Sequence, residues 1–394
     1  MCASPRCTGT SARRAISENS LTNSATASDS DDRAHMRAAL TLAQRGLGSV
    51  APNPAVGCVL VKDGHVVGRG WTQPGGRPHG ETEALDRAGP LAAGATAYVT
   101  LEPCAHHGET PPCAEALAAA GVARCVVAMG DPDPRVSGAG LAHLRGAGLD
   151  VAVGTLAEEA ADVNAGFLMR VETGRPLVTL KLATSLDGRI ATGGGESRWI
   201  TGEPARAYAH LLRVQYDAVL VGSGTAMSDN PRLDVRLPGL AARSPLRIVL
   251  DGRLRVPLNH DLVARAKVQP TLLLTGAGQP EGELATLERA GVEVATVGQD
   301  GDGRLSLDAV LALLGQRGLT RLLVEGGGEL AAGLFGADLV DRMVWFHAPG
   351  VIGGDGVAAV GGYALAGLAD MTRFRRLSTA RLGEDLVETY ARVA

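Results

Sequence analysis

The chain has 394 residues, a formal net charge of −4 and an aromatic content of only 3%. This length is enough for two domains of ordinary size, each with its own hydrophobic core. The slightly negative charge and the few aromatic residues argue against a nucleic-acid-binding surface, which is normally basic with stacking rings, and favour chemistry on a small molecule.

The first segment of the chain, residues 1–34, is rich in Ser, Thr, Ala and Asn and has almost no large apolar side chains. Because such a segment cannot bury enough surface to fold, we expect a disordered tail. Arg6, Arg13 and Arg14 among Ser and Thr faintly resemble a transit peptide, but a plain tail or a start codon assigned too far upstream explains the composition better.

The next part, residues 35–176, is predicted to be one domain of alternating helices and strands. Ordered structure is expected from Asp32, because Met36, Leu40 and Ala43 recur at helical spacing. The Asp63-Gly64 turn predicts a β-hairpin. The expected elements are strands at 56–62 and 65–71, a helix from Glu81, a strand at 95–101, a helix at 113–120 and a strand at 123–129. This alternation is typical of an α/β sandwich.

The residues most informative about function lie within this domain. His79-Gly80-Glu81 is followed by Pro103-Cys104 and then by Cys113. One imidazole and two thiolates are donors that suit Zn²⁺, and three protein ligands leave the fourth tetrahedral position open for catalysis. Glu81 lies two residues from a ligand, where it can move protons. Zinc deaminases have this arrangement of residues.

The spacer between the two cysteines is longer than in the usual deaminase pattern and leaves alternatives open. His106 or His107 could act as a fourth ligand and close a structural zinc site. A metal-free core of one histidine and two thiols is a further alternative. Cys58 and Cys125 lie within apolar runs and are predicted to be packed strand residues with free thiols. The six cysteines form no disulfide pattern, so a reducing compartment, the cytoplasm, is expected. The apolar runs are too short for a membrane span.

A second domain, residues 177–394, is expected to begin with a strand after Arg175-Pro176. Its predicted strands are 177–183, 216–221, 246–250, 271–275 and 321–324. Glycine clusters follow two of them, at 222–225 and at 326–330, and the second cluster opens a helix. Exposed backbone N–H groups at such sites hold phosphates, although a glycine-rich turn alone can be mere geometry.

The second domain lacks the pattern of an ordinary dinucleotide-binding fold. That fold needs a helix between Gly224 and the acid that closes the next strand, here Asp251. The intervening stretch 229–239 contains two prolines and no helical periodicity, so we expect no helix there and a different nucleotide-binding fold.

Together, these motifs resemble those of the bifunctional riboflavin biosynthesis deaminase-reductase family, and the resemblance covers both halves of the chain. In the first half the matching stretches are Pro52-Asn-Pro-Ala-Val-Gly57, His79-Gly-Glu81 and Thr100-Leu-Glu-Pro-Cys-Ala-His-His-Gly-Glu-Thr-Pro-Pro-Cys113. In the second half they are Lys181-Leu-Ala-Thr-Ser-Leu-Asp-Gly-Arg189, Gly195-Glu-Ser-Arg-Trp-Ile-Thr201, Gly224-Thr-Ala-Met-Ser-Asp-Asn-Pro-Arg-Leu-Asp-Val-Arg236 and Glu325-Gly-Gly-Gly-Glu-Leu-Ala331. The long spacer is regular in this family, so His106 and His107 become residues on the substrate side.

The resemblance implies an N-terminal cytidine-deaminase-like α/β/α sandwich followed by a dihydrofolate-reductase-like α/β domain. His79, Cys104 and Cys113 would hold zinc, and Glu81 would shuttle protons during hydrolytic removal of an amine from a phosphoribosylated diaminopyrimidinone. Asn53 is a candidate for recognising the ring, or simply a turn residue between two prolines. Gly80 stands where the family more commonly has Ala, from which we expect little more than a small loss of helix propensity.

For the second domain the resemblance implies NADPH-dependent reduction of the ribosyl group to ribityl. The residues expected at NADPH are Ala183, Trp199, Thr225, Asp229, Gly252, Gly327, Gly328, Glu329, Leu330, Ala331, Ala332 and Gly333. Those expected at the sugar-phosphate substrate are Ser197, Arg213, Leu233, Arg236 and Glu325. The two arginines suit a phosphate, although arginines of this kind are also common on solvated surfaces. Lys181, from its charge and position, is a candidate for polarising the sugar oxygen.

Three functions of different classes remain in competition. The preferred one is a soluble two-step enzyme that acts on a small molecule and forms homo-oligomers through the reductase domain. A nucleic-acid-editing deaminase would need a basic groove, which the charge disfavours. A zinc-stabilised binding module would have no catalysis, and replacing Glu81 separates all three.

Overall fold

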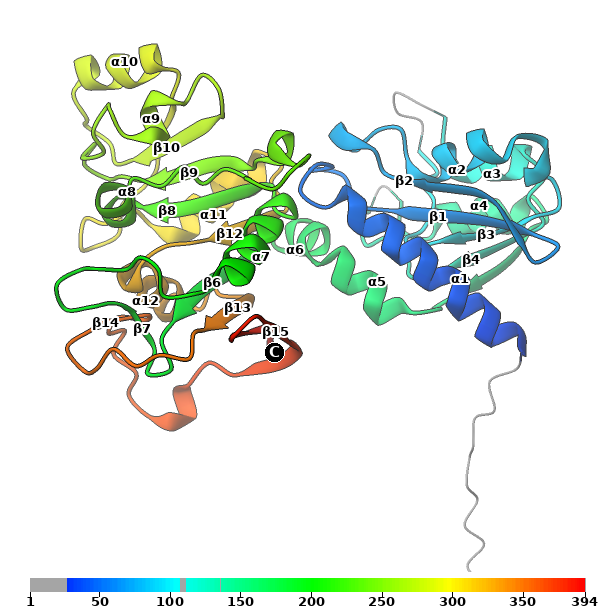
Figure 1. Ribbon diagram of the computed structural model, residues 1–394. Coiled ribbons are helices and arrows are strands. Elements are labelled where there is room, and N and C mark those ends of the chain that lie inside the picture. The colour runs from blue at the N-terminus through cyan, green and yellow to red at the C-terminus, as the bar shows by residue number, and fades with distance from the viewer. Residues whose placement is uncertain (1–26, 107–110, 135, 394) are drawn as a thin grey trace, which may run out of the picture.

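The computed structural model describes residues 27–106, 111–134 and 136–393, which form two α/β domains, each with its own sheet (Figure 1). His107, which the family resemblance placed on the substrate side, lies outside the described residues. So does most of the expected tail, residues 1–26. Of the helices in the described residues, none is long and apolar enough to cross a membrane.

The first domain has a five-stranded sheet in the order β2-β1-β3-β4-β5. β1 pairs with β2 and β3 antiparallel, and the remaining neighbours are parallel. Its strands are β1 Gly57–Lys62, β2 His65–Trp71, β3 Thr96–Val99, β4 Arg124–Val127 and β5 Asp150–Val153. Its helices are α1 Ala27–Ala43, α2 Gly80–Ala88, α3 Cys113–Ala119, α4 Ala139–Gly146, α5 Ala157–Val163 and α6 Ala165–Thr173. The predicted hairpin and alternation are confirmed.

Helices cover both faces of this sheet, because its central strands are apolar on both sides. One core joins α2, α3 and α4 to strand residues such as Cys58 and Cys125. The other joins α1 and α5 to residues such as Val59 and Val126. Both cysteines are free and fully buried, as expected for packed strand residues. The predicted α/β/α sandwich is therefore confirmed.

The start of α1 differs from the expectation. The helix begins at Ala27, five residues before Asp32, so the last part of the expected tail is helical. The Asp32 carboxylate accepts hydrogen bonds from the Arg124 guanidinium at 2.8 and 2.7 Å and from the Tyr98 hydroxyl at 2.9 Å. Composition alone could not reveal these contacts, because Arg124 and Tyr98 follow Asp32 by 92 and 66 residues in the chain.

The second domain has a nine-stranded sheet in the order β11-β10-β9-β8-β12-β6-β13-β16-β15. The first seven strands are parallel and the last two form an antiparallel hairpin at one edge. The strands of this domain are β6 Leu177–Thr184, β7 Arg189–Ala191, β8 Ala218–Gly222, β9 Leu246–Leu250, β10 Thr271–Thr275, β11 Glu293–Thr296, β12 Arg321–Val324, β13 Arg342–His347, β14 Val357–Ala358, β15 Phe374–Leu382 and β16 Asp385–Arg392. The predicted strands agree with these to within a few residues.

The helices of the second domain lie on both faces of its sheet. They are α7 Glu203–Val214, α8 Ser223–Asp229, α9 Asp261–Ala264, α10 Glu281–Ala290, α11 Leu307–Gln316 and α12 Gly328–Gly336. One core contains α11 and α12, and the other contains α7, α9 and α10. The expectation of no helix after Gly224 was partly wrong, because α8 forms from Ser223 to Asp229. It ends where Asn230 adopts a left-handed conformation with φ 41° just before Pro231.

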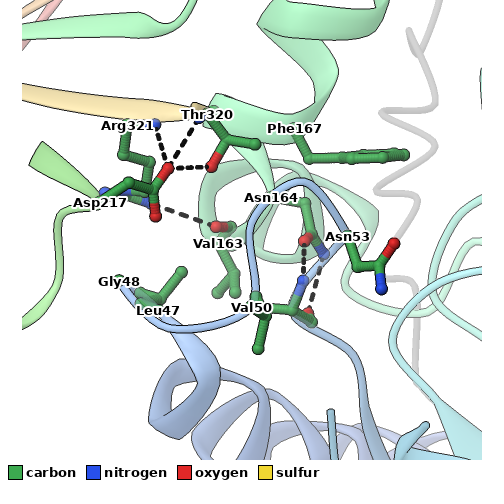
Figure 2. A pocket seen from close by; sticks show the side chains of 12 residues that line it. Leu47, Gly48, Val50, Asn53, Val163, Asn164, Phe167, Asp217, Thr320 and Arg321 are labelled. Atoms are coloured by element: carbon green, nitrogen blue, oxygen red, sulfur yellow. Dashed lines mark hydrogen bonds between the residues drawn. The ribbon is translucent and has the colours of Figure 1, made fainter. Parts of the chain in front are cut away.

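The two domains meet in an interdomain joint, made by residues 47–55 and 163–167 of the first domain and 214–217 and 318–321 of the second (Figure 2). The Arg321 guanidinium donates to the Val163 carbonyl at 3.2 Å. Asp217 fixes the arginine's own strand by accepting from the Arg321 amide at 2.8 Å. A Cβ at Gly166 would lie 2.6 Å from the Thr320 carbonyl oxygen, so only glycine allows this approach. The joint therefore rests on close backbone packing.

Candidate active sites

In the first domain the predicted zinc ligands come together. The Nδ1 atom of His79 and the Sγ atoms of Cys104 and Cys113 all lie within 4.8 Å of one another. His79 precedes α2, Cys113 opens α3, and Cys104 lies in the loop after β3. The Cys113 amide donates to the Cys104 sulfur at 3.3 Å. Three elements thus bring one imidazole and two thiols to a single point, and this set of soft donors fits zinc.

Glu81 lies in the first turn of α2 and is only 3% exposed. Its Oε2 atom is buried and has no hydrogen-bond partner among the described residues. Burial raises the pKa of Glu81 to about 7, and the neighbouring His79 opposes this rise. A buried carboxylate with one unpartnered oxygen beside a ligand cluster is suited to accept and return a proton.

The thiols are prepared for metal binding. Hydrogen bonds from Cys113 and then His79 lower the pKa of Cys104 to about 4, although burial acts in the opposite direction. The same hydrogen bond raises the pKa of Cys113, and burial adds to the rise. The lowered pKa favours the thiolate of Cys104, and thiolates are the metal-binding form.

Close packing around position 80 explains why a glycine stands there. A Cβ at Gly80 would lie 2.8 Å from the Val56 carbonyl oxygen and 3.2 Å from the Trp71 Cα. The expectation that Gly80 costs only helix propensity was therefore incomplete, because glycine also allows α2 to approach the β1–β2 hairpin closely.

Asn53 sits in the turn that leads into β1, where its side-chain amide donates to the Gly76 carbonyl at 3.0 Å. A Cβ at Gly76 would collide with the Asn53 side chain, 1.9 Å from its Nδ2 atom. This contact gives Asn53 a structural role in the loop before His79. Recognition of the ring by Asn53 stays a prediction.

In the second domain the candidate residues gather at the carboxyl ends of neighbouring parallel strands. β8 leads into Gly222 and Thr225, and the adjacent β12 leads into Glu325 and Gly327. The Gly327 amide donates to the Thr225 hydroxyl at 3.1 Å, which joins the two glycine loops. Ligands of open α/β sheets bind at this edge, and the N-terminus of α12 offers free N–H groups for a phosphate.

The glycine loops leave room for a cofactor. A Cβ at Gly222 or Gly224 would meet no atom within 4 Å. Asp251, the acid that an ordinary dinucleotide fold would use, is completely buried and accepts from the Val256 amide at 2.8 Å. It therefore organises its own loop, in agreement with the expected departure from that fold.

A charged cluster stands beside these loops. Both Glu325 carboxylate oxygens accept from the Arg213 guanidinium, at 2.6 and 3.0 Å, and the Lys181 Nζ lies 4.0 Å away. Arg213 also donates to the Asp234 carbonyl at 2.8 Å. Burial lowers the pKa of Lys181, and Glu325 opposes this shift. Burial alone would raise the pKa of Glu325, but Arg213 holds it at about 2.

Other predicted residues lie around the carboxyl ends of these strands, and their side chains differ in solvent exposure. Trp199 is 68% exposed, with the Arg206 guanidinium 4.6 Å from its ring centroid. Arg198 donates to the carbonyl of Asp229. Arg236 pairs with the Asp234 carboxylate. Ser197 is half-buried, and Ala183 lies on β6. The structure brings these residues to one side of the sheet without showing what each would bind.

Three predicted residues have their side chains turned into the protein. Leu233 is 3% exposed and packs in the core, with φ +54°, so only its backbone is available to a substrate. Ala331 and Ala332 on α12 are also buried, whereas Gly327 and Gly328, at the start of that helix, are half-buried. Backbone rather than side-chain contact is what these positions offer.

Comparison with known proteins decides the family. Residues 176–388 match the RibD C-terminal domain, and residues 29–129 match the cytidine and deoxycytidylate deaminase zinc-binding region. The riboflavin biosynthesis protein RibD of Escherichia coli is 43% identical over 368 residues, which cover 90% of this chain and 98% of that protein. The chain belongs to the RibD family.

Further RibD proteins agree. The Aquifex aeolicus RibD is 40% identical over 92% of this chain and 98% of its own length. Acinetobacter baumannii RibD, form 2, superposes with a TM-score of 0.81 at 37% identity and covers 93% of this chain and 100% of that chain. A Thermotoga maritima structure described as a diaminohydroxyphosphoribosylaminopyrimidine deaminase and 5-amino-6-(5-phosphoribosylamino)uracil reductase has the same TM-score of 0.81 at 32% identity.

RibD membership confirms several expectations. The chain is a bifunctional enzyme of riboflavin biosynthesis, with a zinc-dependent deaminase domain and a reductase domain that uses NADPH. The zinc ligands match a group of side chains that the structure places together. The two expected α/β folds are those of the solved RibD structures.

Two contributors to the reductase cluster were not predicted. The Nδ1 atom of His210 donates to the Asp234 carbonyl at 3.0 Å and lies 3.4 Å from the Arg213 Nη1 atom. Asp234 uses its carbonyl for Arg213 and its carboxylate for Arg236. The only indication in the sequence that either residue belongs to the reductase cluster was the position of Asp234, two residues before Arg236.

Proposed function

We propose that the first domain removes the exocyclic amine of 2,5-diamino-6-(5-phosphoribosylamino)pyrimidin-4-one by hydrolysis. His79, Cys104 and Cys113 would hold zinc, which supplies Lewis-acid chemistry that makes water nucleophilic near neutral pH. Glu81 takes one proton from the attacking water and delivers it to the ring nitrogen, then takes the remaining proton from the new hydroxyl group on the ring carbon and delivers it to the amine, which leaves as ammonia. The observation that carries this proposal is the buried Glu81 carboxylate, with its Oε2 atom unpartnered among the described residues, beside the three ligand atoms.

The second domain then reduces the ribosyl group of 5-amino-6-(5-phosphoribosylamino)uracil to ribityl. NADPH would supply a hydride to the anomeric carbon of the opened sugar. Thr225, Asp229, Gly252 and the 327–333 loop hold the cofactor. Lys181, whose ammonium has a lowered pKa, polarises the sugar oxygen and delivers the accompanying proton.

The remaining predicted residues serve substrate and cofactor from the same edge. Arg213 and Arg236 face the phosphate, with Arg213 oriented by Glu325. Ser197 and the backbone of Leu233 complete the substrate site. Ala183 and Trp199 border the nicotinamide nucleotide. Asn53 orients the pyrimidine in the first domain while it supports the Gly76 turn.

The organisation of the molecule is part of the proposal. The deaminase domain, expected at residues 35–176, also includes the start of α1 from Ala27, and residues 177–394 form the reductase domain, with the boundary between α6 and β6. The protein acts in the cytoplasm and forms homo-oligomers through the reductase domain. Its partners are small phosphoribosyl-pyrimidine molecules, not nucleic acids or membranes.

The decisive experiment replaces Glu81 by Gln. The amide keeps the shape of the side chain but cannot accept a proton, so deamination should fall by at least about a hundredfold. Zinc content and NADPH oxidation with the deaminated pyrimidine should stay at the wild-type level. A Glu81→Gln protein that still deaminates would contradict the mechanism. A wild-type protein without zinc would contradict the metal site.

A further inference from the structure

Glu102, two residues before the ligand Cys104, is a buried acid for which the proposed mechanism has no task. Its side chain is only 4% exposed. Among the described residues no Lys, Arg or His side chain forms an ion pair with it. A buried carboxylate without a cation is costly unless hydrogen bonds satisfy it. Its partners therefore show what holds it there.

Four backbone amides from one later segment donate to the Glu102 carboxylate. Oε1 accepts from the Gly140 and Leu141 amides at 2.9 and 3.2 Å, and Oε2 accepts from the Gly138 and Asp131 amides at 3.1 and 3.3 Å. Gly140 and Leu141 belong to the first turn of α4, whose own N-cap residue is Gly138 and has no side chain for this purpose. Glu102 thus caps α4 from 36 to 39 residues away.

The same contact fixes the backbone of the metal-ligand loop. A Cβ at Gly140 would lie 1.9 Å from the Pro103 carbonyl oxygen, so α4 packs directly against the residue between Glu102 and Cys104. On the other side, the Ala114 amide of α3 donates to the Cys104 carbonyl at 3.1 Å. The Cys104 loop therefore lies between α3 and α4 and contacts both helices. On the α4 side, the Glu102 carboxylate makes the polar contacts.

We propose that Glu102 is a positioning residue for the metal centre, which holds the Cys104 thiolate in place by anchoring its loop to α4. This inference rests on the zinc site of the proposed function and adds a residue that holds the loop of one ligand in place. Replacing residues that orient metal ligands typically changes metal affinity by about 10- to 100-fold.

The test compares zinc release and cobalt spectra of full-length variants. Glu102→Gln keeps the size of the side chain, but its NH₂ group must face two of the four N–H donors. We expect zinc to dissociate into a chelator at least about tenfold faster than from the wild type. The thiolate-to-cobalt absorption band of the Co²⁺-loaded protein should shift or weaken, and the deaminase kcat should fall more than its KM rises.

The matched control is Asp217→Asn in the second domain, where the carboxylate also accepts several hydrogen bonds, from the Thr320 amide and hydroxyl at 2.7 Å each. It should lower the stability of the protein without changing zinc release or the cobalt spectrum. Equal acceleration of zinc release in both variants would mean that Glu102 acts only through global stability, and the proposal would be wrong.

A second variant keeps the proposal testable if Glu102→Gln does not fold. Gly140→Ala leaves the carboxylate intact but pushes on the Pro103 carbonyl, and it should alter the same cobalt band. Wild-type zinc release together with an unchanged spectrum in whichever variant folds would overturn the inference. If instead the wild-type protein holds no zinc, the proposed deaminase function itself fails, which separates the two outcomes.

Discussion

At the scale of single residues, the reductase site depends on a buried ion pair. The side chains of Glu325 and Arg213 are only 11% and 12% exposed, and both carboxylate oxygens are hydrogen-bonded to the guanidinium. Family resemblance placed both residues near the substrate. It did not reveal that they bind each other, because they are 112 residues apart and meet only when α7 packs beside β12.

Replacement of Glu325 by Gln should destabilise the second domain by about 3 kcal/mol, because it leaves the buried charges of Arg213 and Lys181 without their counterion. Urea denaturation at neutral pH measures this loss. The exposed pair of Glu293 with Arg317 supplies a control, since Glu293 is 57% exposed there and Glu293→Gln should change stability by less than about 0.5 kcal/mol. Similar losses in both variants would contradict the assignment of Glu325.

The same carboxylate gives the stability a defined pH dependence. Its pKa is about 2 in the folded protein, below the ordinary value of 4.5. A depressed pKa contributes stability that is fully present above the unfolded value and is lost as the pH falls through the folded value. Wild-type stability should therefore decrease between about pH 4.5 and pH 2, and Glu325→Gln should flatten this part of the profile. An unchanged slope in the variant would show that other acids cause the decrease.

At the scale of elements, local pattern predicted most strands and the helices that carry the metal site. The β1–β2 hairpin follows from Asp63-Gly64, and α2 follows from the apolar spacing after His79. The start of α1 could not be predicted, because Asp32 is held by Arg124 and Tyr98 through tertiary contacts. The short α8 was missed because it has only seven residues and ends at Asp229, where the proline-containing stretch without helical periodicity begins.

The packing of α2 on β2 gives a prediction at this scale. A Cβ at Gly70 would lie 2.1 Å from the Gly80 carbonyl oxygen, at the turn of α2 that carries Glu81. Gly70→Ala should therefore displace the first turn of α2, lower the thermal stability of the first domain and reduce deamination by about tenfold or more, as expected when catalytic groups are misplaced. NADPH-dependent reduction, measured by absorbance, should be unaffected.

Gly146→Ala is the control for this substitution. A Cβ at Gly146, in the last turn of α4, would meet no atom within 4 Å. This change should leave deamination unchanged and stabilise the protein by up to about 1 kcal/mol through helix propensity. If Gly70→Ala behaves like Gly146→Ala, the contact between β2 and α2 does not position Glu81.

At the scale of the whole molecule, the interdomain joint and the candidate reductase site lie at opposite ends of the parallel strands of the second sheet. Asp217 and Arg321 belong to the joint and stand at the start of β8 and β12, whereas Gly222 and Glu325 stand at their ends. A strand of five residues spans roughly 15 Å. The sequence could not predict this arrangement, because it depends on contacts such as Arg321 to Val163 between residues 158 apart.

This arrangement predicts that the deaminated intermediate passes through solution. A mixture of Glu81→Gln protein, which keeps the reductase, and Lys181→Met protein, which keeps the deaminase, should oxidise NADPH from the diaminopyrimidine. The steady-state rate of NADPH oxidation by the mixture should equal that of wild-type protein present at the same concentration as each variant. A mixture that is much slower than this wild-type reference would indicate direct transfer inside one molecule. The reference rate of each separate activity serves as the control.

The close backbone contacts of the joint also bear on how this enzyme can vary in evolution. A Cβ at Gly48 would lie 2.3 Å from the Val214 carbonyl oxygen, and one at Gly166 would lie 2.6 Å from that of Thr320. In a library of random point mutants selected for growth without added riboflavin, both codons should tolerate few replacements, although neither residue belongs to a proposed catalytic site. A lineage that separated the two domains into independent genes would be released from this constraint, and its glycines at these positions would be free to drift.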